Sequence, residues 1–281
     1  MLAIIGGSGL YRIDGLVRIE KHEITTPFGP PSAGTVRGEY HGVECLFLPR
    51  HGEQHQYLPS EINYRANIWA LKSLGARRIL SVSAVGSLRE SIQPGDLSLP
   101  HQYFDFTRGL RERTFFGKGM VAHVAMAQPT CTALASDVLR AAEILSLPLH
   151  TKITYACIEG PRFGTRAESL FLRNANCDLV GMSNVPEVFL AREAQLSYCT
   201  IAITTDYDGW QDDPAQHVNM SQAMQMYREN IAKVTLLLSQ LLSQPLSEPP
   251  DYCRHSLKNA VLTPESTLNP AQRALLTLLK Q

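Results

Sequence analysis

Short apolar runs alternate with amphipathic helical stretches along most of this chain of 281 residues, and this alternation constrains the fold strongly. Strand-like apolar runs occupy residues 2–5, 43–49, 78–83, 97–100, 151–157, 179–182 and 199–203. Helical spacing occupies residues 63–74, 132–147, 165–175, a segment that opens at Ser183 or Asn184, 220–241 and 271–280. This pattern predicts an α/β fold with a central mixed, largely parallel β-sheet flanked by helices.

Two segments depart from the alternation. Residues from about 103 to 128 show no clean period, and we interpret them as an excursion from the sheet. The segment QPLSEPP, residues 244–250, breaks the helix that precedes it. We therefore expect a single domain over residues 1–243, followed by a Pro-containing linker and a helical tail over residues 244–281.

Composition excludes some functions. Twenty-six basic and 26 acidic residues cancel, so nothing indicates nucleic-acid binding or attachment to a membrane surface. Residues 2–5 look like a first strand rather than a signal peptide, and no apolar run is long enough to span a bilayer. We expect a cytoplasmic protein. The six cysteines are scattered without a CxxC pair, which favours small buried hydrophobes over metal ligands or disulfides.

The apolar run 199–203 ends abruptly in Thr204, Thr205, Asp206 and Asp208. Open α/β sheets bind ligands at the carboxyl ends of their strands, and on a continuing strand both carboxylates would face the same side. Because two adjacent carboxylates repel, we expect one pKa to rise. That carboxyl group could then donate a proton to a ring nitrogen, while its neighbour accepts from an amino group. The alternative is an Asp-rich turn after a strand.

Four other predicted strand ends carry polar groups, at Ser8, Arg50–His51, Ser83 and Ser183. Ser8 lies in a glycine turn that has neither P-loop nor GxGxxG spacing, so a purely structural turn stays an alternative. Hydroxyl groups, a guanidinium, an imidazole and backbone donors together suit one phosphate dianion. Carboxylates would repel phosphate and must face another part of the ligand.

Phe163, beside a Gly-Pro turn, could stack on a planar ring. A phosphate, a heterocycle and a group between them indicate a nucleoside that is cleaved by phosphate. Eight segments then occur in order over roughly residues 1–240: IIGGSGLY, TTPFGPPS, RHG, NYRANIWALK, SAVGSLRESIQPGD, IEGPRFGTRAES, GMSNVPEVFLAREA and TTDYDGW. With these segments the chain resembles the trimeric nucleoside phosphorylases, and more narrowly the 5′-methylthioadenosine phosphorylases.

The resemblance implies a pentosyltransferase of purine and methionine salvage that cleaves 5′-methylthioadenosine into adenine and 5-methylthioribose 1-phosphate. It implies a homotrimer with inorganic phosphate as co-substrate and no metal or organic cofactor. The implied phosphate-binding groups are Ser8, Arg50, His51, Ser83, the backbone of Ala84, and Ser183. In the same way, Met182 would lie under the ribose, Phe163 on the base, and His123 would reach the 5′ group from an adjacent subunit. The implied 5′-methylthio pocket comprises Met220, Ala223 and Met224.

The resemblance also implies which residues contact the purine base and which kind of purine the site prefers. Asp206 would act on purine nitrogen seven and Asp208 on the exocyclic amino group, whereas the 6-oxopurine branch typically carries Asn at the position of Asp206. That branch also carries Glu where this chain has Gly164. Both differences favour a 6-aminopurine. Asn184 replaces a family Thr without an evident role.

Several alternatives remain open. One is a phosphorylase of 6-oxopurine nucleosides or methylthioinosine. A dinucleotide-binding oxidoreductase is suggested only by the glycine turn. A catalytically silent nucleoside-binding protein is a further alternative, but the presence of every expected polar group argues against it. Serine stands at positions 8, 83 and 183 where the family commonly has threonine, which retains the hydroxyl group. Met220 and Met224 are bulkier and softer than the usual Val and Leu, so the 5′ pocket could accept other groups.

Overall fold

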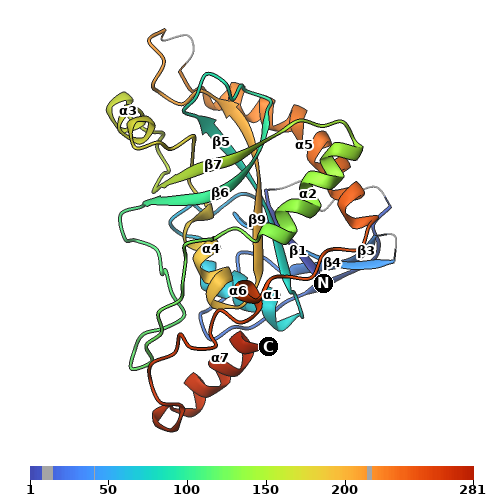
Figure 1. The fold of residues 1–281 in the computed structure, drawn as a ribbon, viewed down its shortest axis with the longest axis vertical. Helices are drawn as coiled ribbons and strands as arrows, with labels where there is room; N and C mark the ends of the chain where they lie inside the picture. Colours follow the sequence, from blue (N-terminus) through green and yellow to red (C-terminus); the bar gives the residue numbers. More distant parts are fainter. Residues whose placement is uncertain (8–14, 41, 214–216) are drawn as a thin grey trace.

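The computed structural model describes residues 1–7, 15–40, 42–213 and 217–281 (Figure 1). Its strands are β1 Leu2–Gly6, β2 Val17–His22, β3 Thr35–Tyr40, β4 Val43–Pro49, β5 Arg78–Ser87, β6 Leu97–Phe106, β7 Leu149–Ile158, β8 Leu179–Gly181 and β9 Ser197–Asp206. Its helices are α1 Tyr64–Ser73, α2 Thr132–Ile144, α3 Arg166–Asn174, α4 Asn184–Glu193, α5 Met220–Leu242, α6 Asp251–Arg254, the 3-10 turn Glu265–Thr267, and α7 Pro270–Lys280.

Within the described residues, all nine strands form one mixed sheet in the order β2-β3-β4-β1-β5-β8-β7-β6-β9. Strand β9 also pairs with β5, so the strands from β5 to β9 close into a ring. Parallel pairing joins β4, β1, β5 and β9, so these strands end at the same edge of the sheet. The α/β fold with a mixed central sheet is confirmed.

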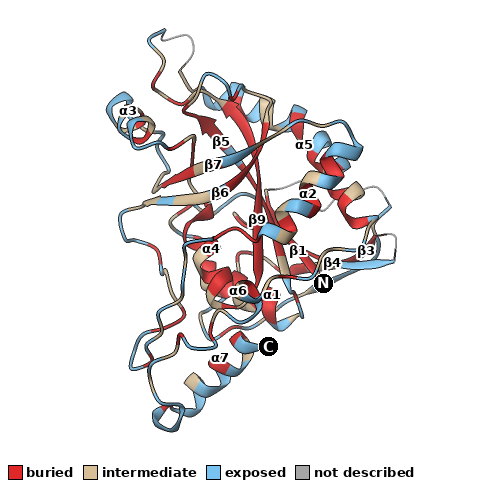
Figure 2. Cartoon of the chain, viewed as in Figure 1, coloured by how far each residue is buried: buried red, intermediate tan, exposed pale blue. Residues whose placement is uncertain are grey.

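Helices cover both faces of the sheet. Helices α1, α4 and α7 pack with one set of core residues, whereas α2 and α5 pack with another. Along β1, Ala3 and Ile5 join the first core while Leu2 and Ile4 join the second. Figure 2 shows β1, β5 and β9 as buried strands between helices whose outer faces are exposed. Burial on both faces explains why these strands are largely apolar and do not alternate between polar and apolar residues.

The boundaries depart from the sequence expectations at several points. Strands β2 and β3 were not anticipated, because β2 (VRIEKH) is polar and almost wholly exposed at the edge of the sheet. The region interpreted as an excursion begins later than expected, since β6 continues through Phe106. In the tail, Leu268, Leu276 and Leu279 are buried in the same core as α1. The division of the chain at residue 243 stays a prediction.

Local sequence explains where several helices begin. Thr165 caps α3 in a capping box with Glu168, and Asn269 caps α7 in the same way with Gln272. The side chain of Asn219 accepts two backbone N–H groups at the start of α5. Over the described part of the chain, no helix is both long enough and apolar enough to cross a membrane.

Candidate active site

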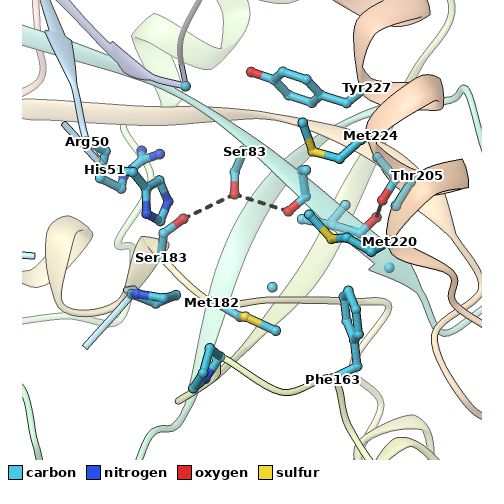
Figure 3. Close-up of a pocket in the computed structure, with 18 of the residues that line it drawn as sticks. Arg50, His51, Ser83, Phe163, Met182, Ser183, Thr205, Met220, Met224 and Tyr227 are labelled. Carbon is cyan, nitrogen blue, oxygen red and sulfur yellow. Dashed lines mark hydrogen bonds between the residues drawn. The ribbon is translucent and has the colours of Figure 1, made fainter. Parts of the chain in front are cut away.

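A cavity of about 370 Å³ opens where β1, β4, β5 and β9 end, with α5 along one side (Figure 3). Its polar side chains fall at two places. Arg50, His51, Ser83 and Ser183 gather at one end. Thr205 and the methionines of α5 lie at the other end. Asp206, which accepts from the Thr205 hydroxyl, and Asp208 also line the cavity. The cavity therefore offers a cationic and hydroxyl-bearing end and a carboxylate-bearing end.

The structure brings most of the predicted site residues to this cavity. The predicted residues that line it are Arg50, His51, Ser83, Ala84, Phe163, Met182, Ser183, Asp206, Asp208, Met220, Ala223 and Met224. Ser8 lies outside the described residues. His123 is exposed on the irregular segment after β6 and is not among the lining residues; its backbone N–H donates to the Ala260 carbonyl at 2.9 Å.

Arg50 is only 2 % exposed and follows β4 directly. Its Nε and Nη2 donate to the two Glu187 carboxylate oxygens at 2.6 and 2.8 Å, and Nη2 also donates to Ser81 Oγ at 2.6 Å. Nη1 donates to the Val82 carbonyl at 3.2 Å. Burial opposes the charge of Arg50, but the Glu187 carboxylate outweighs it and raises the pKa. A guanidinium has five N–H donors, so one Nη1 hydrogen is left over by these bonds.

His51 is neutral in this environment. Its Nδ1 lies 2.9 Å from the Tyr57 carbonyl oxygen, which can only accept, so Nδ1 carries the hydrogen and Nε2 the lone pair. Burial lowers the pKa of His51 to about 4, although the bond to Tyr57 acts in the opposite direction. A neutral His51 can accept a hydrogen bond at Nε2 but brings no positive charge.

The hydroxyl groups of Ser83 and Ser183 lie 3.3 Å apart at the cationic end. Ser83 belongs to β5 and Ser183 precedes α4, whose Asn184–Glu193 span is buried along most of its length. The Ser183 side chain makes no cap bond to its own helix. The Ser83 hydroxyl also donates to the Ala84 carbonyl at 3.4 Å, a long contact that a bound ligand could replace. Asn184, whose role the sequence left open, donates to Ser81 Oγ at 3.0 Å and to the Tyr198 hydroxyl at 2.9 Å below the cavity.

Asp206 is the last residue of β9, and two donors hold its carboxylate. Thr205 Oγ1 donates to Oδ2 at 2.7 Å, and the Asp208 backbone N–H donates to Oδ1 at 2.8 Å. Burial raises the pKa of Asp206 to about 6 despite these donors. The charge of Asp208 contributes least among the causes, so the expected rise is present but desolvation causes it rather than repulsion.

Asp208 does not continue the strand, which corrects the geometric expectation for the pair. The strand ends at Asp206, and Asp208 has a left-handed backbone with φ 53°. Its side chain turns toward α3, where Oδ2 accepts from the Ser169 hydroxyl. Burial also raises the pKa of Asp208, although the hydrogen bond from Ser169 lowers it. Both carboxylates still line the cavity, so the segment is a turn and also a candidate site.

Apolar side chains flank the carboxylate end. Phe163, Met220 and Met224 face the cavity from opposite sides (Figure 3). They remain 38 %, 56 % and 38 % exposed in the single chain. A planar ring could therefore lie against Phe163, while the two methionines leave one side of the cavity open.

Sequence reasoning missed several residues of this site. Thr205 and Tyr227 line the cavity, and Glu187 holds Arg50 from below. Tyr227 belongs to α5, and a Cβ atom on Gly7 would lie 3.2 Å from its hydroxyl oxygen. Residues 55–59 complete the wall beside His51 without any motif that would have indicated them. Among the described residues, no group of three or more His, Cys, Asp or Glu is placed to hold a metal ion.

Residues 1–242 match the family model described as phosphorylase superfamily. The S-methyl-5′-thioadenosine phosphorylase of Thermofilum pendens is 46 % identical over 93 % of this chain and 98 % of the relative. That of Geobacter sulfurreducens is 42 % identical over 97 % of this chain and 94 % of the relative.

Solved structures give the same picture. A methylthioadenosine phosphorylase from an antarctic soil metagenomic library superimposes with a TM-score of 0.92 at 43 % identity, covering 99 % of this chain and 98 % of that one. The methylthioadenosine phosphorylase of Schistosoma mansoni in complex with adenine has a TM-score of 0.82 at 39 % identity, with 86 % and 90 % covered.

Proposed function

Because this chain belongs to the phosphorylase superfamily, and within it to the S-methyl-5′-thioadenosine phosphorylases, we propose that it cleaves 5′-methylthioadenosine with phosphate. The products are adenine and 5-methylthioribose 1-phosphate. The observation that carries the proposal is one cavity with a guanidinium and hydroxyl groups at one end and two carboxyl groups of raised pKa at the other. An anion and a purine base would each find a complementary end.

Phosphate occupies the cationic end in this proposal. The free Nη1 hydrogen of Arg50, the hydroxyl groups of Ser83 and Ser183 and the Ala84 backbone donate to its oxygens. His51 is neutral with a lone pair on Nε2, so it accepts from a protonated phosphate oxygen and does not act as a cation.

The base lies against Phe163, with Asp206 at nitrogen seven and Asp208 at the exocyclic amino group. As the glycosidic bond breaks, positive charge develops on the ribose and negative charge on the purine. The phosphate dianion stabilises the ribose and attacks its anomeric carbon, while the electron pair of the broken bond stays on the purine. Protonated Asp206 delivers its proton to nitrogen seven and neutralises the leaving group; its raised pKa supports that role.

Met182 lies under the ribose in this arrangement, and Met220, Ala223 and Met224 receive the 5′-methylthio group. A thioether is soft and polarisable, as methionine side chains are, so the contact suits both partners. We also propose a cytoplasmic location and a reaction that needs no metal or organic cofactor.

The test is base release from the purified protein. We expect adenine release from 5′-methylthioadenosine that requires phosphate, and slower release from methylthioinosine, adenosine and inosine. Release that does not depend on phosphate would identify a hydrolase and contradict the proposal. Faster cleavage of methylthioinosine than of 5′-methylthioadenosine would instead favour the 6-oxopurine alternative.

We further propose a homotrimer in which His123 of one subunit reaches the 5′ pocket of the next. In the single chain, Met220 and Met224 leave that side of the cavity open, and the segment that carries His123 exposes Leu110 and Val121. These side chains are 72 % and 46 % exposed, which is typical of a surface that another subunit covers.

His123→Ala is expected to raise the KM for 5′-methylthioadenosine several-fold, about 0.5–1.5 kcal/mol for one lost contact, without changing the mass of the oligomer. Steady-state kinetics and light scattering measure the two effects. His255→Ala, which removes an exposed histidine outside the cavity lining, is the control and should leave KM unchanged. A fully active monomer at assay concentration would contradict the shared site.

A further inference from the structure

Ser169 makes a contact to Asp208 that neither the motifs nor the proposed mechanism uses. Its side chain is fully buried on α3, and its Oγ bonds to Asp208 Oδ2. The same oxygen lies 3.0 Å from the Thr165 carbonyl one turn earlier. Asp208 is itself only 3 % exposed. A buried hydroxyl therefore meets one oxygen of a buried carboxyl group at the end of the cavity assigned to the base.

The backbone fixes both partners of this contact. The capping box between Thr165 and Glu168 sets the start of α3, and Ser169 follows directly. On the other side, the Asp208 backbone N–H is held by Asp206 Oδ1, and the Asp208 carbonyl accepts from the Val218 N–H at 3.1 Å. The pair is thus held by the fold, not by the rotamer of one side chain.

Gly164 closes the remaining side of the pair. A Cβ atom there would lie 3.3 Å from Ser169 Oγ and 3.4 Å from Asp208 Oδ2, closer than most side chains pack. The small residue lets the backbone approach both oxygens. Removing the Ser169 hydroxyl would therefore leave Asp208 Oδ2 without this donor in a closely packed place.

We propose that Ser169 is a positioning residue that makes the site select 6-aminopurines, by donating to Asp208 Oδ2 and keeping that carboxylate ionised. This inference rests on the proposed function. An ionised Asp208 leaves Oδ1 as an acceptor for the hydrogen of an amino group. A 6-oxo group presents only an acceptor and is repelled, whereas a protonated Asp208 could donate to it.

The charges around Asp208 support this direction. Burial raises its pKa, and the bonds from Ser169 and the Gly209 N–H lower it. Glu168, which is on α3 with Ser169, raises the pKa of Asp208 further. Glu168 stays ionised because Arg162 lowers the pKa of Glu168 to about 2. From β9 the neighbouring carboxyl group is Asp206. Without the Ser169 donor, the pKa of Asp208 should therefore rise, so a larger fraction of Asp208 would be protonated and neutral at a given pH.

The two carboxyl groups leave opposite marks on a pH profile. If Asp208 must be ionised to accept the amino group, kcat/KM for a 6-amino substrate falls as pH decreases through its pKa. If Asp206 must be protonated to donate to nitrogen seven, kcat/KM falls as pH increases through the pKa of Asp206. The acid limb therefore reports Asp208, and the alkaline limb reports Asp206.

The experiment compares Ser169→Ala and Ser169→Cys with wild type on 5′-methylthioadenosine and methylthioinosine at saturating phosphate. For Ser169→Ala we expect the ratio of kcat/KM for methylthioinosine to that for 5′-methylthioadenosine to rise about tenfold, because a hydrogen bond to a charged group is lost. The acid limb with 5′-methylthioadenosine should move to higher pH. Ser169→Cys keeps the volume with a weaker donor and should give a smaller change in the same direction.

Ser73→Ala is the matched control, because it removes a serine hydroxyl that bonds to a backbone carbonyl of its own helix, α1, and does not line the cavity. It should leave the ratio and the acid limb in place. An equal loss on both substrates in Ser169→Ala, with an unmoved acid limb, would show a merely structural serine and overturn the inference. The same shift in Ser73→Ala would overturn it as well. A wild type that releases no adenine with phosphate would instead contradict the proposed function, before any variant is compared.

Discussion

Replacing Asp206 with alanine is expected to lower kcat for 5′-methylthioadenosine by about 10²–10⁴-fold, the usual cost of a lost general acid. The departing purine would then carry negative charge that no group neutralises. Asp206 sits at the end of β9 with a pKa of about 6, so it holds a proton more readily than an ordinary carboxyl group. Phosphate binding at the opposite end of the cavity should change little. Single-turnover rates measure the loss in the chemical step, and KM values for 5′-methylthioadenosine and phosphate measure any change in binding.

Asp206→Asn should give a different result from alanine. An amide still donates a hydrogen bond to nitrogen seven but cannot release a proton, so kcat falls while the ratio of 6-oxo to 6-amino activity rises. Asp208→Asn should move the same ratio with less effect on the chemical step. If neither variant shifts the ratio, the two carboxyl groups do not distinguish 6-amino from 6-oxo purines, and the segment is only an Asp-rich turn.

The pH profile gives an independent check on Asp206. Because the protonated form is the donor and its pKa is about 6, kcat/KM for the wild type should fall as pH rises through about 6. Asp206→Asn should lack this alkaline limb, since an amide does not titrate. Asp212→Ala is a control: this carboxylate follows in the same segment, with its side chain 97 % exposed, and should keep the limb. A limb that survives in Asp206→Asn would assign the titration to another group.

Arg50→Ala is expected to lower the free energy of unfolding by about 3–5 kcal/mol, because it leaves the Glu187 carboxylate buried without its partner. Both side chains of this ion pair are only 2 % exposed. The same variant should raise the KM for phosphate far more than the KM for 5′-methylthioadenosine, since it removes the guanidinium from the anion end. Denaturant unfolding and steady-state kinetics report the two losses separately.

A double variant separates the two roles of Arg50. Arg50→Leu with Glu187→Leu removes both charges together, and apolar replacement of a buried pair is often close to neutral in stability. We expect it to recover part of the stability lost in Arg50→Leu alone, while phosphate KM stays high. A double variant with normal phosphate KM would make Arg50 purely structural. Equal increases of the two KM values in Arg50→Ala would lead to the same conclusion.

Strand and helix alternation determined the fold class, because strands buried on both faces are largely apolar and amphipathic helices must cover them. The same reasoning found the carboxyl ends of β4 and β9, since buried runs that stop at Arg50 and Asp206 leave polar side chains at one edge. It placed the end of β5 too early, because the strand continues past Ser83 to Ser87. The polar edge strand β2 gave no such signal. It pairs with β3, and most of its side chains stay exposed.

Contacts between distant segments were decided only by the tertiary structure. Glu187 neutralises Arg50 from 137 positions away, and Ser169 reaches Asp208 across 39 positions. The physical reason is that protonation depends on burial and on which donors face a group, and neither can be read from neighbours in the chain. Sequence alone placed an imidazole, His51, at an anion site without its protonation state, and it suggested a repelling pair of carboxylates. Burial made His51 neutral, and burial, more than repulsion, raised the pKa of Asp206.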